Sequence, residues 1–208
     1  MATCPLCSSR AAKRYCPAKS TQICAVCCGT KREVEIDCPS SCPYLKASRS
    51  YEAEKPIDPE LMAKIQKYDD SFFQRFRHVL EATNKAVAEE RASSPWLVDH
   101  DVIEVYKALS ATMKTLSSGI YYESLPEGPV RVALFRRLKD SFDELMKPDS
   151  SADHPVLKAS EAVEALDFVT VAAQLNSGVR PRSRRYLDWL CETFGYPQPQ
   201  QSSSLILP

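Results

Sequence analysis

Cysteine spacing is the feature that most constrains how this chain can fold. Eight of the nine cysteines lie between residues 4 and 42, and the ninth, Cys191, lies near the other end. Disulfide frameworks belong mainly to secreted proteins, and the first residues lack the basic and apolar segments of a secretory signal. In a reducing compartment, clustered cysteines bind metal more often than they pair with one another. We therefore expect a metal-binding module in a cytoplasmic protein.

The spacing divides the eight cysteines between two structural zinc ions. Zn²⁺ prefers four thiolate or imidazole ligands in a tetrahedron, and one Cys-x2-Cys turn supplies two of them. Two such turns complete a first site, with the predicted ligands Cys4, Cys7, Cys24 and Cys27. The remaining cysteines can complete a second site, with the predicted ligands Cys16, Cys28, Cys38 and Cys42. The two sites interleave along the chain, so metal binding would fold a segment too short for its own hydrophobic core.

From residue 4 to residue 27 the cysteines follow the pattern C-x2-C-x8-C-x7-C-x2-C, and a more distant pair closes the series. This pattern resembles the B-box zinc finger of tripartite-motif proteins, in which the first, second, fifth and sixth ligands share one zinc. By this resemblance the third ligand falls on Cys16 and the last pair on Cys38 and Cys42. The fourth falls on Lys19, which cannot bind zinc, so Cys28 is the substitute. The family implies protein contacts and self-association, and treble-clef and MYND-like fingers share part of the spacing.

The rest of the sequence predicts an all-α domain. Residues 48–58 are polar and proline-containing, so we expect a linker there. Apolar residues then recur at steps of three and four, and breaks rich in proline or glycine separate four to five helices between residues 59 and 195. The predicted helices span residues 59–93, 99–120, 130–146, 156–176 and 183–194. The expected fold is a small zinc-stapled N-terminal module (residues 1–47) followed by an antiparallel helical bundle and a disordered tail, residues 196–208.

No catalytic pattern stands out in this sequence. The three histidines, His78, His100 and His154, form no metal-binding pair, and neither a phosphate-binding loop nor a nucleophile elbow is present. Cys191 lies among apolar residues, where an interior thiol is commoner than a nucleophile. We therefore predict a non-enzymatic zinc-binding scaffold or adaptor for protein–protein interaction, with self-association as a further expectation.

Charge leaves a nucleic-acid-binding regulator as an alternative. Residues 1–50 carry eight Lys/Arg and three acids, although eight thiolates and two zinc ions would lower this excess to about +1. The basic residues that such a regulator would use are Lys13, Arg14, Lys31, Arg32, Arg180, Arg182, Arg184 and Arg185. For the arginine run we favour a solvated helix start beside the helical domain, where residues 51–208 carry 19 basic and 24 acidic side chains.

Two further expectations concern the cysteines and the membrane. A redox sensor that uses Cys27 and Cys28 is another interpretation of the cysteine cluster. No stretch approaches the roughly 18 apolar residues that cross a bilayer, so we expect no membrane association.

Overall fold

The N-terminal module contains a small β-hairpin and one short α-helix. In the computed structural model, which describes residues 2–54, 56–148 and 156–197, strands β1 (Arg14–Cys16) and β2 (Thr21–Ile23) pair in antiparallel register. A single 3-10 turn, η1 (Pro17–Lys19), joins them, and helix α1 (Ala25–Lys31) follows directly. These strands were not predicted, because three residues are too few to show the alternation by which a strand is recognised.

Cysteines form most of the small core of this module. Ile23 and Ile36 are almost fully buried among them, each with 1% of its surface exposed. Few other large apolar side chains take part, and Leu6 and Tyr44 only cover the edge of this cluster. A core of this size stabilises a fold weakly, so the module needs a further source of stability such as a metal.

Helix α2 (Pro43–Ala53) replaces much of the predicted linker. Pro43 occupies the first turn, where its missing N–H costs nothing, and Leu45 is buried. The helix then continues through residues 48–53, which we expected to belong to a linker. The linker prediction is therefore wrong for these residues. Arg49 explains the difference, because its ion pairs with Glu33 and Asp188 hold the polar helix in place.

The predicted helix over residues 59–93 is divided into α3 (Pro59–Ile65) and α4 (Asp70–Ser93). Asp69 ends the break and caps α4, since its carboxylate accepts a hydrogen bond of 3.0 Å from the backbone N–H of Phe72. The apolar steps of three and four continue across the break, and for this reason the periodicity did not reveal it. A capping aspartate three residues before a buried aromatic residue was the available signal.

The other predicted helices are confirmed, with small shifts at their ends. They are α5 (Asp99–Ser117), α6 (Pro129–Leu145), α7 (Ala159–Asn176) and α8 (Arg185–Phe194). Their apolar stripes form one core, in which Tyr106, Leu109, Leu134 and Leu166 are each 0% exposed. Residues 149–155 and 198–208 lie outside the described residues, and the predicted tail falls almost entirely there.

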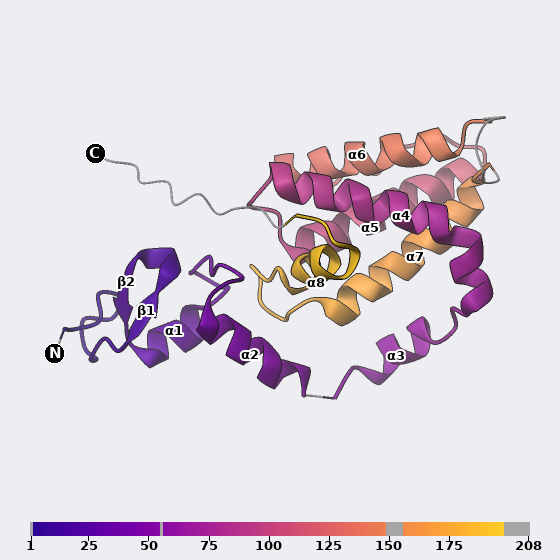
Figure 1. The fold of residues 1–208 in the computed structure, drawn as a ribbon. Coiled ribbons are helices and arrows are strands. Elements are labelled where there is room, and N and C mark those ends of the chain that lie inside the picture. Colours follow the sequence, from indigo (N-terminus) through magenta and orange to yellow (C-terminus); the bar gives the residue numbers. More distant parts are fainter. Residues whose placement is uncertain (1, 55, 149–155, 198–208) are drawn as a thin grey trace.

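Four helices form a closed ring around this core. Helix α4 packs on α6 and α7, and α5 packs on the same two helices, so α4 and α5 occupy opposite corners. Helix α8 contacts α4, α5 and α7 and closes the end of the bundle that faces the module (Figure 1). Helix α3 lies against the outside of α7. No described helix is long and apolar enough to cross a membrane.

The bundle is not wholly antiparallel, which corrects the predicted arrangement. Arg131 at the start of α6 donates to Asp101 at the start of α5 over 2.7 Å, so these two helices run in the same direction. Residues 118–128, which we call the crossover strap, return along the outside of α5 instead of turning tightly. The N–H of Ser124 donates to the hydroxyl of Thr112 over 3.0 Å on this return path. An extended segment of this length reaches about 36 Å, which exceeds the length of α5 at about 1.5 Å per residue.

Candidate metal centre

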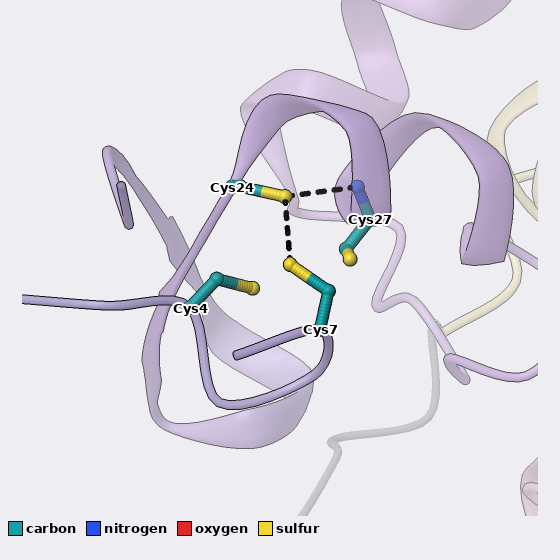
Figure 2. Close-up of side chains that lie close together, drawn as sticks. All are labelled: Cys4, Cys7, Cys24 and Cys27. Atoms are coloured by element: carbon teal, nitrogen blue, oxygen red, sulfur yellow. Dashed lines mark hydrogen bonds between the residues drawn. The ribbon is translucent and has the colours of Figure 1, made fainter. Parts of the chain in front are cut away.

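The first predicted Cys-x2-Cys turn forms a tight loop. The N–H of Cys4 donates to the carbonyl oxygen of Arg10 over 2.8 Å, which closes the loop. The N–H of Ser8 donates to the carbonyl oxygen of Cys4, also over 2.8 Å, and Ser8 takes a left-handed conformation with φ 52°. This turn places the side chains of Cys4 and Cys7 on the same side of the loop (Figure 2).

The second turn lies at the start of α1. Cys24 is the N-cap residue, and its sulfur accepts a hydrogen bond of 3.3 Å from the N–H of Cys27. Such N–H···S bonds are typical of zinc knuckles, because they stabilise the thiolate and fix the direction of the sulfur. The β1–β2 hairpin returns the chain to the first loop, so that Cys24 and Cys7 face each other.

The four sulfurs converge on one point, as predicted for the first site. The Sγ atoms of Cys4, Cys7, Cys24 and Cys27 all lie within 4.8 Å of one another (Figure 2). The Sγ atoms of Cys7 and Cys24 are 3.9 Å apart. A regular tetrahedron with Zn–S bonds of about 2.3 Å has S···S edges of about 3.8 Å, so the residues fit a tetrahedral metal ion. We call these four residues the cysteine quartet.

The electrostatics of the quartet favour a bound cation. Hydrogen bonding to Ser9 lowers the pKa of Cys7 to about 5, which favours its thiolate. Burial, together with the neighbouring sulfurs, raises the pKa of Cys27 to about 12. Without a cation the sulfurs therefore cannot all be ionised together, whereas a divalent metal ion would stabilise four thiolates at once. Such an ion would have a full set of protein ligands and no position for a reacting water.

The second predicted ligand set is not assembled in the same way. Among the residues that the structure describes, no second group of three or more ligand atoms reaches the spacing of the quartet. Burial raises the pKa of Cys38 to about 11, and negative charge on Cys42 and Cys16 adds to this shift, so these two thiols lie within electrostatic reach of Cys38. Cys28 accepts from Arg32 Nη2 over 3.6 Å. The second zinc therefore remains a prediction.

Several basic residues that we predicted for nucleic-acid binding form hydrogen bonds or ion pairs within the protein. Arg180 donates to the carbonyl oxygens of Gly29 and Arg32, at 3.0 and 2.6 Å. Arg184 is 4% exposed and pairs with Asp37 of the module. Arg180 and Arg184 thus join the bundle to the module, and the predicted solvated helix start is wrong for the buried Arg184. Sequence reasoning identified the run but not its partners, because these contacts join residues almost 150 positions apart.

Cys191, the cysteine outside the module, has the surroundings of an interior residue. Cys191 is 1% exposed, and burial raises the pKa of its thiol, so a nucleophilic role is unfavourable. No disulfide joins any of the nine cysteines, all of which lie in the described part of the chain, and Cys27 and Cys28 are thus unpaired with each other.

No family model, no curated protein and no solved structure matches this chain.

Proposed function

We propose that this protein is a non-enzymatic scaffold or adaptor of the cytoplasm, in which a zinc-stapled, B-box-type module is fixed to a helical bundle that binds a protein partner. The cysteine quartet carries this proposal. Four buried or half-buried thiolate donors saturate a zinc ion, and a saturated zinc ion stabilises a fold rather than activating water. A reducing compartment keeps such thiols available for metal.

A second zinc ion is part of the same proposal. Cys16 and Cys42 lie within electrostatic reach of Cys38, and Cys28 belongs to the same small core as Cys16 and Cys38. Native mass spectrometry of the full chain purified without added metal tests this directly. We expect two zinc ions per chain, and one after Cys38→Ala. A single zinc ion in both samples would limit the metal to the quartet.

The crossover strap offers the surface for a protein partner. Within six residues it exposes four large apolar side chains, namely Ile120, Tyr121, Tyr122 and Leu125, by 63%, 63%, 64% and 53%. Scattered exposed apolar residues are normal, whereas a contiguous group of this kind is typical of interaction sites. Tyrosine is also enriched at protein interfaces, because it combines a large apolar ring with a hydroxyl.

A groove runs beside this surface. It has a volume of about 640 Å³ and lies between α5 and the strap, with Ala108, Tyr122, Leu125 and Pro126 among its lining residues. Lys107 and Arg131 also line it, and both are already paired, with Glu104 and Asp101. Glu104, Ser124 and Glu127 complete the polar part of the lining, so the groove suits an amphipathic segment of a partner, with apolar side chains against Tyr122 and Leu125.

Site-specific photo-crosslinking in cells tests the partner surface. A photoreactive phenylalanine analogue replaces Tyr121, and a matched control carries it at the exposed position of Lys85 on α4. We expect a discrete crosslinked protein from position 121 only, which is lost when Tyr122→Ser and Leu125→Ser are added. Identical crosslinking from both positions would contradict the assignment of this surface.

The hairpin favours nucleic acid as a second candidate. Residues 2–30 contain no carboxylate side chain, and Arg10, Lys13 and Lys19 are exposed near Tyr15, which is 58% exposed. An exposed aromatic ring among basic residues is the arrangement that binds single strands by stacking and charge. Binding of a fluorescent single-stranded oligonucleotide that weakens with salt and with Tyr15→Ala would support it. Absence of binding at low salt would remove this candidate.

A further inference from the structure

One short segment of the bundle contacts the module directly behind the cysteine quartet. Arg180 Nη1 donates to the carbonyl oxygen of Gly29, two residues after Cys27, and to that of Arg32 at the end of α1. The N–H of Arg182 donates to the carbonyl oxygen of Glu33 over 2.9 Å. The segment therefore binds backbone carbonyl groups of α1 and of the two residues that follow it. These groups have this arrangement only while α1 is folded.

The C-terminal part of the same segment binds α2 and the loop before it. Asp188 accepts from Ser40, just before α2, and from Arg49 inside it, both over 2.6 Å. Arg49 also donates to Glu33 over 2.9 Å, which joins α2 to the loop after α1. Asp188 is 4% exposed, so this network is shielded from water and from screening by salt.

The segment is equally fixed to the interior of the bundle. Asp99 accepts from the hydroxyl of Ser183 over 2.8 Å and from the N–H of Tyr186 over 3.2 Å. The hydroxyls of Tyr186 and Tyr106 are 3.1 Å apart in the core. A structural change in the module is thus connected to the core of the bundle through residues 180–188, which we call the docking segment.

We propose that metal binding by the cysteine quartet and docking of the bundle are coupled through the docking segment. The contact between the bundle and the module then depends on whether the quartet holds a metal ion. Helix α1 has seven residues, and a helix this short does not persist by itself in water. Its first turn is held by Cys24 and Cys27, so loss of the metal frees α1 and removes the acceptors of Arg180. The proposal goes beyond the scaffold function and rests on the quartet, not on the partner surface.

Thermodynamic linkage makes the coupling measurable from both sides. If metal binding favours docking, docking must favour metal binding by the same factor. Arg180→Ala removes two hydrogen bonds of the docking segment while leaving every cysteine in place. Arg182→Ala is the matched control, because the Arg182 side chain is exposed and only its backbone N–H reaches the module.

Zn²⁺ affinity of the full chain is measured by competition with a chromophoric chelator, after native mass spectrometry has established the zinc content. We expect Arg180→Ala to weaken Zn²⁺ binding by at least about fivefold and Arg182→Ala to leave it within twofold of the wild type. Equal Zn²⁺ affinities of Arg180→Ala and the wild type would contradict the coupling but would leave the scaffold proposal unaffected.

Amide hydrogen exchange of the wild type provides the second readout and needs no variant. On removal of zinc with a chelator, we expect faster exchange at the amides of Arg182, Tyr186 and Leu187 as well as in the module. Unchanged protection of these three amides in the zinc-free protein would overturn the proposal, because the stability of the docking segment would then not depend on the metal.

Discussion

Arg184 of the bundle pairs with Asp37 of the module, and the arginine side chain is almost entirely buried in this contact. Its Nε also donates to the carbonyl oxygen of Leu97 over 3.2 Å. One guanidinium group therefore joins three parts of the chain, namely the loop before α2, the loop between α4 and α5, and the start of α8. A buried charge of this kind makes the module and the bundle depend on each other for stability, because loss of its counter-charge would strongly destabilise the folded protein.

Replacement of Asp37 tests this interdependence. Asp37→Ala leaves Arg184 with a carbonyl acceptor but without a counter-charge, and we expect a loss of about 2 to 4 kcal/mol in the free energy of unfolding. Glu35→Ala is the control, because Glu35 forms an exposed pair with Lys31 in the same loop and should change stability by less than about 0.5 kcal/mol. Denaturant unfolding followed by circular dichroism measures both. Similar effects of the two variants would show that the Arg184 contact contributes little.

The apolar periodicity of the helices was sufficient to predict most of the bundle. Tyr106, Leu109 and Met113 follow steps of three and four, and all three are fully buried in α5. The direction of the helices was not predictable in the same way. Periodicity defines which face of a helix is buried, but it does not tell whether the residues after Ser117 turn back at once or cross the bundle as the strap does.

The quartet was also predictable from sequence, because two Cys-x2-Cys turns supply a complete tetrahedral ligand set whatever the fold between them. The contact between module and bundle was not. Asp37 and Arg184 are ordinary charged residues in polar stretches, and no local pattern marks a pair that forms across 147 positions. The same holds for Asp188. Its sequence context predicts an ordinary acidic residue on a helix surface, and only the structure shows its contacts with Arg49 and Ser40.

Gly178 is predicted to tolerate no side chain. A Cβ at this position would lie 2.5 Å from the Oγ of Ser183 and 3.0 Å from its Cβ. Ser183 cannot move away without losing its bond to Asp99, so we expect Gly178→Ala to destabilise the protein by about 1 to 3 kcal/mol. Gly29→Ala is the matched control, since a Cβ there meets no atom within 4 Å and alanine favours the helix by up to about 1 kcal/mol. Thermal unfolding should move in opposite directions for the two variants.

Asp99 is predicted to give part of the stability a dependence on pH. Burial raises the pKa of its carboxyl group, so the folded protein holds this proton more tightly than the unfolded chain does. The resulting stabilisation is complete below the ordinary aspartate pKa of about 4 and is lost as the pH rises through the raised value. We therefore expect the unfolding free energy of the wild type, minus that of Asp99→Asn, to fall as the pH rises above about 4. The exposed Asp140→Asn should give no such trend, and a difference that rises with pH would contradict the prediction.

Loss of a quartet cysteine is predicted to have a different effect from loss of Cys191, the buried cysteine of the bundle. Cys24→Ala deletes a metal ligand, the acceptor of the Cys27 N–H and the cap of α1 in one step. We expect this variant to lose the zinc ion of the quartet and the protease resistance of residues 2–47, because metal binding and folding of the module are one process. Cys191→Ala removes an equally buried sulfur from the core of the bundle, at a cost of about 1 kcal/mol, and should keep the full zinc content. Zinc retained by Cys24→Ala at the wild-type level would mean that the quartet is not the metal site, since three ligands and a water hold structural zinc far less tightly than four thiolates.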